Sequence, residues 1–130
     1  MQNNIQKYQS LVNKTIPISQ YMHWTINKLT NIEISSTTLL APNINVHGTG
    51  FAGSVYAAAM ATGWTLLKHW YDEQKFETTL LAAEANIKYI SPVNTDFTCT
   101  AEIDNQSSQY IKLIQRLQEK RSCAVWGTGR

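Results

Sequence analysis

SVYAAAMATGWTLLKHW, the run from Ser54 to Trp70, has the length of a buried helix and carries one charged side chain, Lys68. No Asp, Glu, Lys or Arg occurs between Glu33 and Lys68, and alanine dominates the middle of the run. A helix without a polar face is buried on all sides, and its small residues let a sheet come close. We therefore predict a long central helix enclosed by a curved sheet, since a flat sheet would leave half of the helix in water.

The chain before this helix predicts two short helices and a hairpin. Apolar residues at helical spacing indicate an amphipathic helix that ends before Pro17, and a further turn covers Ile18–Met22. Trp24–Ile26 and Ile32–Leu40 are typical of two strands, or of one bent hairpin, with Asn31 at the turn. The apolar positions of the first helix are Ile5, Tyr8, Leu11 and Val12.

After the central helix, two stretches alternate apolar and polar residues with the period of a strand. The first, Leu81–Tyr89, stops at Ser91-Pro92, and the second covers Phe97–Ile103. Since only a short connection separates them, we predict two long antiparallel strands.

A last helix and a last strand follow. Ser107 or Ser108 can cap the helix, and Lys120 and Arg121 suit its carboxyl end. Ser122–Trp126 then predicts a strand. The apolar stripe of the helix consists of Tyr110, Leu113, Ile114 and Leu117.

Composition and charge exclude several classes of protein. With 43% hydrophobic content, residues 1–130 are expected to form a single α+β domain around one core. The formal net charge is +2 and the basic residues are scattered, so nucleic acid binding is not expected. Neither a signal peptide nor a membrane-spanning run is visible, which predicts a cytoplasmic protein without membrane contact. In that compartment Cys99 and Cys123 are expected to be buried free thiols.

The stretch with the most unusual chemistry, PNINVHGTGFAGS from Pro42 to Ser54, leads directly into the central helix. Glycines before a helix allow a ligand to approach the backbone. The free amides of the first turn, backed by the helix dipole, can polarise a carbonyl or hold an anion. We therefore expect ligand binding at this end of the helix.

Residues in and after this stretch resemble a known family. It is the bacterial thioesterase domain found at the carboxyl end of YiiD-type proteins, which belongs to the hotdog superfamily. The resemblance runs from about Ile16 to Arg121. The matching residues are Asn45, His47-Gly48-Thr49, Phe51-Ala52-Gly53-Ser54, Tyr56-Ala57, Thr62-Gly63-Trp64, Ile87, Tyr89, Pro92-Val93 and Asp96-Phe97.

The resemblance implies a hotdog fold, in which an antiparallel sheet wraps one long central helix and acyl thioesters bind between paired protomers. It implies an acyl-CoA or acyl-carrier-protein thioesterase of fatty acid metabolism, working as a homodimer or a dimer of dimers, with no metal and no organic cofactor. Two features depart from the pattern. Many hotdog thioesterases carry an Asp or Glu on the helix, whereas Met60 stands in this region. Family members also continue beyond Arg130, so the last strand is expected to be incomplete.

Two rival interpretations of the same stretch are weaker. Gly48, Gly50 and Gly53 match the dinucleotide fingerprint G-x-G-x-x-G, but that fingerprint needs a hydrophobic strand before the first glycine, and polar residues precede it. His47 and Ser54 could be a base and its nucleophile, yet no third orienting group is evident. A serine at the start of a helix is more often a cap.

Because the helix offers no carboxylate, Glu84 is the candidate base. On the polar side of a predicted strand beside the helix, partial burial would make its carboxylate a better general base. An ordinary solvent-facing glutamate is an equally good interpretation.

The remaining candidate residues would bind or position the substrate. Backbone amides in Gly48–Ser54 would polarise the thioester carbonyl, while Asn45 and His47 would position the substrate or a water molecule. Lys88 would meet the phosphates of the CoA or phosphopantetheine arm. The candidate substrate-binding residues are Gly48, Thr49, Gly53, Ser54 and Lys88.

A second class of function stays open, a module that holds an acyl thioester without hydrolysing it. The lack of a helix carboxylate favours this module. The polar set Asn45, His47 and Glu84 favours catalysis.

Overall fold

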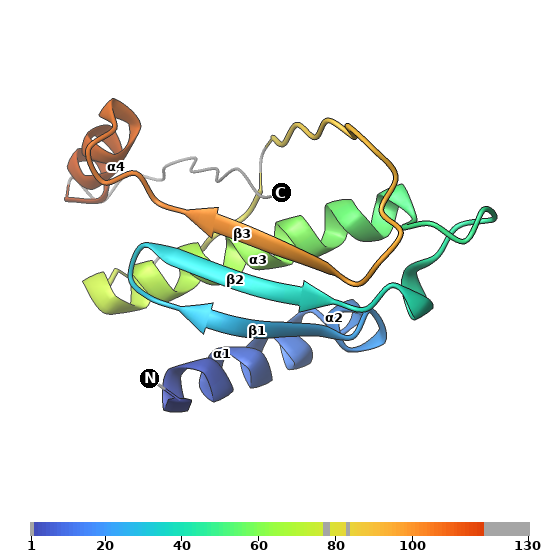
Figure 1. Cartoon of the computed structure of the whole chain (residues 1–130). Helices are drawn as coiled ribbons and strands as arrows, with labels where there is room; N and C mark the ends of the chain where they lie inside the picture. The colour runs from blue at the N-terminus through green and yellow to red at the C-terminus, as the bar shows by residue number, and fades with distance from the viewer. Residues whose placement is uncertain (1, 77–78, 83, 119–130) are drawn as a thin grey trace.

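The computed structural model describes residues 2–76, 79–82 and 84–118, and it places one long helix against a three-stranded sheet (Figure 1). In chain order the elements are α1 (Gln2–Thr15), α2 (Ile18–Tyr21), β1 (Trp24–Leu29), β2 (Glu33–Thr38), the 3-10 helix η1 (Ala41–Asn43), α3 (Ala52–Gln74), β3 (Phe97–Glu102) and α4 (Ser108–Gln118). The predicted α+β class, with its long helix on an antiparallel sheet, is confirmed.

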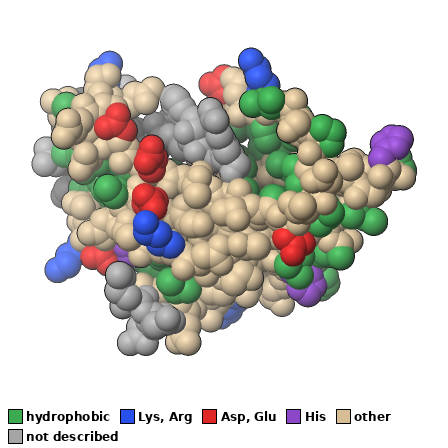
Figure 2. All heavy atoms as spheres, viewed as in Figure 1, with side chains coloured by type: hydrophobic (Ala, Val, Ile, Leu, Met, Phe, Trp, Pro, Cys, Tyr) green, Lys and Arg blue, Asp and Glu red, His purple; other side chains and the backbone are tan. Residues whose placement is uncertain are grey.

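β2 is the central strand and pairs antiparallel with β1 on one side and with β3 on the other. The β1–β2 hairpin turns at Asn31, as predicted, and β1 contains a bulge between Ile26 and Lys28. Alternate side chains point inward, so that Ile34 and the free thiol of Cys99 are buried. The opposite side of the sheet carries uncharged polar residues and makes up the centre of the face seen in Figure 2. These uncharged residues are Thr25, Ser35, Thr37, Thr98 and Thr100, and the charged Lys28, Glu33 and Glu102 lie at one end of the same side.

One buried threonine joins α3 to two strands. The Thr62 hydroxyl donates to the Ala58 carbonyl at 2.6 Å and accepts the Trp24 Nε1–H at 3.0 Å. The Ser36 hydroxyl lies 2.7 Å away. A hydroxyl has one hydrogen, and Thr62 gives its own to α3, so Ser36 is the donor. Helix and sheet are therefore held in one relative position by directional bonds as well as by apolar packing.

α1 covers the free edge of β1. Its apolar side enters the core through Tyr8 and Val12. Next to them, Gln9 uses both ends of its amide: Nε2 donates to the Trp24 carbonyl at 3.0 Å, and Oε1 accepts the Ile26 N–H at 2.7 Å. No described strand lies beside this edge of β1. A glutamine thus satisfies two backbone groups that would otherwise attract another strand.

A smaller aromatic cluster connects the carboxyl end of α3 to α4. Trp70 and Tyr71 are buried, and Tyr110 and Ile114 pack against them. The Ser107 hydroxyl accepts the Tyr110 N–H at 3.1 Å. The predicted serine cap and the predicted last helix are both confirmed. The predicted strand Ser122–Trp126 lies outside the described residues.

The predicted strand Leu81–Tyr89 is wrong. Its described residues have no regular secondary structure, and Leu81 is 76% exposed. An alternating pattern favours a strand only if another strand offers hydrogen-bond partners, and no described strand pairs with this segment. The predicted hairpin between Leu81–Tyr89 and Phe97–Ile103 is wrong for the same reason, although Phe97–Glu102 does form β3.

The prediction that the central helix is buried on every side is also wrong. The sheet covers one side of α3, whereas Tyr56 and Met60 are only half-buried and Ala52 is exposed. Three described strands are too few to wrap a helix. Although α3 has 23 residues, no described helix is long and apolar enough to cross a membrane.

Candidate functional site

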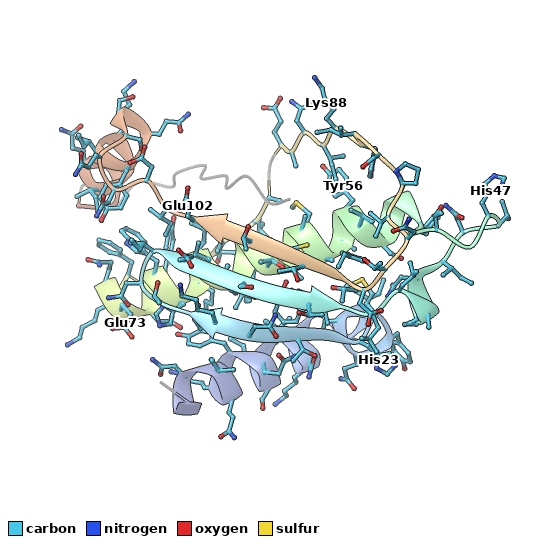
Figure 3. All side chains as sticks on the ribbon, in the orientation of Figure 1. His23, His47, Tyr56, Glu73, Lys88 and Glu102 are labelled. Atoms are coloured by element: carbon cyan, nitrogen blue, oxygen red, sulfur yellow. The ribbon has the colours of Figure 1, made fainter. Side chains whose placement is uncertain are left out.

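The residues before α3 form a projecting loop that Asn45 holds together. An antiparallel bridge joins Ile44 to Gly50 across its base. The Asn45 Oδ1 accepts the N–H groups of His47 at 2.9 Å and Thr49 at 3.2 Å, and Nδ2 donates to the Thr49 hydroxyl at 2.8 Å. The Asn45 amide is thus occupied in shaping the loop, with His47 at its tip (Figure 3).

Two glycines fix the path of this loop. Gly48 has φ 78°, in the left-handed region that favours glycine. Gly50 donates its N–H to the Val93 carbonyl at 2.6 Å, and a Cβ on Gly50 would lie 2.9 Å from the Val93 Cβ. The Tyr89 hydroxyl adds a bond to the Ala52 carbonyl at 2.9 Å. The segment before β3 is therefore fastened to the start of α3 at two points.

At the start of α3, three backbone N–H groups have no acceptor among the described residues. Its N-cap, Phe51, provides no side-chain hydrogen bond, and the Val55 N–H makes the first bond of the helix, to the Phe51 carbonyl at 3.0 Å. No described acceptor meets the N–H groups of Ala52, Gly53 and Ser54. Together with the positive end of the helix dipole, these donors can bind an anion or a carbonyl oxygen.

The set of usable amides is narrower than the predicted stretch Gly48–Ser54. The four amides from Gly48 to Phe51 already donate within the protein. Their acceptors are the Asn45 carbonyl, the Asn45 Oδ1, the Val93 carbonyl and the Asn43 carbonyl. The expected capping role of Ser54 is also wrong, because the helix starts two residues earlier and Phe51 is its N-cap.

The polar candidates do not converge in the described chain. His47 and Lys88 are exposed, and Figure 3 shows both side chains pointing outward. Glu84 is exposed too, and makes no described hydrogen bond or ion pair. The partly buried strand position predicted for Glu84 is not found, because no strand of the described chain lies beside its segment.

An apolar stripe, defined by Tyr56, Met60 and Gly63, continues from the free amides along α3. Residues three and four apart lie on one side of a helix, and this side faces away from the sheet. All three are half-buried, and a Cβ on Gly63 would meet no described atom within 4 Å. Beside the stripe, Trp64 donates its Nε1–H to the Leu80 carbonyl at 3.2 Å. The stripe can accept an apolar ligand that starts at the amides.

Tyr56 is a polar member of this site that the sequence analysis named only as a residue matching the family. Figure 3 shows it projecting from α3 toward the segment that carries Lys88. Its hydroxyl has no hydrogen-bond partner among the described residues. The sequence feature that could have identified Tyr56 was its position, one helical turn after the glycine-rich entry to α3.

Metal and dinucleotide chemistry find no support in the described residues. They contain no group of three His, Cys, Asp or Glu side chains placed to hold a metal ion. No strand leads into Gly48, since η1 and the projecting loop come before it. A dinucleotide site requires such a strand.

Comparison with known proteins gives one family and several related structures. The family model described as "Putative thioesterase (yiiD_Cterm)" matches residues 5–126. The crystal structure of a "putative thioesterase" from Shewanella oneidensis is 27% identical, with a TM-score of 0.86, and the match covers 100% of this chain and 87% of that one.

Two further structures share the fold. A protein of unknown function from Chlorobaculum tepidum is 26% identical with a TM-score of 0.81, over 88% of this chain and 70% of that one. A Pseudomonas aeruginosa protein, described as a probable thioesterase, is 16% identical with a TM-score of 0.61, over 88% of this chain and 74% of that one. At this identity, the similarity to the Pseudomonas aeruginosa protein shows a shared fold and nothing more. The expected hotdog-type fold is confirmed by these structures together.

Proposed function

Because the chain belongs to the thioesterase family of YiiD carboxyl-terminal type, we propose that it hydrolyses an acyl thioester of CoA or of an acyl carrier protein. The observation that carries this proposal is the set of three free N–H groups at Ala52, Gly53 and Ser54, which leads into an apolar stripe. The amides suit the thioester carbonyl, and the stripe suits the acyl chain.

The amides are proposed to act on the charge that develops during hydrolysis. Water attacks the carbonyl carbon, the carbonyl oxygen becomes negative, and collapse of the tetrahedral intermediate releases the thiol. Donors that are already in place stabilise this oxygen more in the transition state than in the ground state. Loss of one such donor typically lowers kcat by about 10² to 10³.

The acyl chain is proposed to lie along the stripe of Tyr56, Met60 and Gly63. At about 1.5 Å per residue, the helix rises about 13 Å from Ser54 to Gly63. No charged residue occurs along this path. Trp64, held by its bond to the Leu80 carbonyl, limits the path beside Gly63. Gly63→Leu should therefore shift hydrolysis toward shorter acyl chains and leave short-chain turnover intact.

Glu84 remains the proposed base. The other described carboxylate of its segment, Asp96, already accepts the Leu40 N–H at 2.8 Å, whereas Glu84 has no partner among the described residues. His47 and Asn45 keep their proposed place at the mouth of the site, His47 through its side chain and Asn45 through the loop it shapes. Lys88 is proposed to meet the phosphates.

The proposed working form is a homo-oligomer. In the described chain, Leu81 is 76%, Tyr89 52% and Ile90 82% exposed, on a segment without a neighbouring strand. A second copy against this segment would cover these side chains and partly bury Glu84, which would improve it as a base. Ile90→Lys should shift the protein toward monomer in light scattering coupled to gel filtration.

The test is thiol release from acyl-CoAs of increasing chain length by the wild type and two variants of Ala52. Ala52→Pro removes one free N–H at the first helical position, where proline is tolerated. Phe51, at ψ 128°, has the extended backbone that a following proline requires. Ala52→Gly keeps the N–H and serves as the control. We expect turnover to fall in the proline variant alone, and equal turnover in both would contradict the role of this amide.

A second candidate function, a binding module without hydrolysis, is favoured by one observation. Between Ala52 and Leu67, α3 carries no carboxylate, and Glu84 is exposed in the described chain. Thiol release that disappears in Glu84→Gln, with acyl-CoA binding retained, supports the enzyme. Tight binding without any release by the intact oligomer supports the module instead.

A further inference from the structure

His69 is a buried imidazole far along α3 from the candidate site. It is 2% exposed, and neither ring nitrogen has a hydrogen-bond partner among the described residues. Glu73 Oε1 lies 3.7 Å from its Nε2, too far for a hydrogen bond. The backbone of Thr30 lies near the ring but makes no hydrogen bond to it. A buried polar group in this state destabilises the form that buries it.

Three elements enclose this imidazole, and α1 is one of them. The Tyr8 ring meets the His69 ring edge-on, with centroids 5.1 Å apart. The Tyr8 hydroxyl donates to Asp72 Oδ2 at 2.6 Å, and Lys68 Nζ lies 2.9 Å from Asp72 Oδ1. The turn between β1 and β2 contributes Thr30. His69 is therefore covered by α1 together with this turn, and a movement of α1 would expose the ring to water.

The same stretch of α1 covers the edge of β1. Gln9 follows Tyr8 directly and binds both the Trp24 carbonyl and the Ile26 N–H. A displacement of α1 that exposes His69 therefore also frees the outer edge of β1. The two contacts are coupled through one helix.

We propose that α1 is an acid-released cover: protonation of His69 favours an opened form in which α1 leaves α3 and the edge of β1 becomes available to another strand.

The charges around His69 support this direction. Burial lowers the pKa of His69, and Lys7 on α1 adds to the effect, while Glu73, Asp72 and the Thr30 carbonyl oppose it without outweighing it. The opened form has the ordinary histidine pKa of about 6.5 and binds a proton more readily. Opening is thus disfavoured above pH 6.5 and becomes easier as the pH falls below that value.

The titration of Asp72 does not contribute to this pH response. Burial alone would raise its pKa, but the hydrogen bonds from Tyr8 and Lys68 outweigh burial and hold the pKa below its usual range. Asp72 therefore stays ionised while His69 titrates, and the Tyr8–Asp72 bond persists in the closed form.

The test is amide hydrogen exchange of the full chain, followed by NMR between pH 7.5 and pH 5 and corrected for intrinsic exchange. The Ile26 N–H, which only the Gln9 side chain accepts, reports on the cover, and the amides of β2 report on global unfolding. We expect the opening constant at α1 and Ile26 to rise, by up to about tenfold per pH unit because one proton is taken up. The amides of β2 should keep their protection.

Two variants identify the titrating group. His69→Phe should remove the pH dependence at Ile26. Glu73→Gln keeps the imidazole but removes a carboxylate that favours its charged form in the closed state, so the rise at Ile26 should begin near the same pH and reach a larger total as the pH falls. The proposal is overturned if β2 and Ile26 respond with the same slope, or if neither variant alters the response. The glutamine variant keeps the test decisive even where the phenylalanine variant fails to fold.

Discussion

Thr62→Val is expected to lower the free energy of unfolding by about 2–6 kcal/mol. Valine keeps the shape of the side chain but removes the oxygen that accepts hydrogen bonds from Trp24 Nε1 and, at 2.7 Å, from Ser36. Thr62 and Ser36 are 0% exposed and Trp24 is 2% exposed, so water does not replace the lost partner. An unsatisfied buried donor costs about 1–3 kcal/mol, and two donors are affected.

Thr65→Val is the matched control. Thr65 is also 0% exposed on α3, but its hydroxyl donates only to the Ala61 carbonyl, at 2.7 Å, which keeps its main-chain bond within the helix. The loss should stay below about 1 kcal/mol. Urea unfolding at equal m values gives both differences. Equal losses in the two variants, or an unchanged Thr62→Val protein, would refute the reasoning.

Two further pairs of variants and one single variant test other contacts. Gln9→Met should speed exchange of the edge amides of β1 and promote association at high concentration, whereas Gln20→Met, which loses only an exposed bond, should do neither. Gly50→Ala should lower the Tm because its Cβ would lie 2.9 Å from a valine carbon, whereas Gly63→Ala, with open space and a better helix former, should raise stability by up to about 1 kcal/mol. Tyr8→Phe should cost about 1–2 kcal/mol at pH 7. The pKa of Asp72, which accepts this hydrogen bond, is lowered, so the bond stabilises the fold fully above about pH 4 and less as the pH falls further. Acid unfolding of the variant should therefore begin at a higher pH than that of the wild type.

The sequence predicted most of the fold because the decisive features are local. The charge-free run places α3 correctly, since a helix that meets a sheet cannot carry charge on the side it buries. The alternation in Phe97–Ile103 finds β3 because β2 is there to pair with it. The same alternation in Leu81–Tyr89 led to a wrong prediction of a strand. Periodicity describes the side chains and says nothing about whether a partner strand is present.

The site was less predictable, because its use depends on which groups are already occupied. The glycine-rich entry to α3 was found, but only the structure shows that four of its amides donate internally, while those of Ala52–Ser54 meet no acceptor in the part of the chain that it describes. Asn45 has the chemistry of a binding residue, yet its amide is used by the loop. Tyr56 was named only as a residue matching the family, because an isolated tyrosine in an apolar helix gives no pattern that assigns it to a site.

The order of strands in the sheet has a consequence for how the chain folds. β1 and β2 are joined by a tight turn, whereas β3 reaches β2 only after residues 39–96, which include all of α3. The entropy of closing a loop grows with its length, so the hairpin can form early and β3 must dock late. Until β3 docks, the backbone groups on one edge of β2 have no partner strand, whereas Gln9 can already bond the outer edge of β1. During refolding at high protein concentration, partly folded chains should therefore associate through the unpaired edge of β2. The yield of native protein should fall further the longer β3 takes to dock.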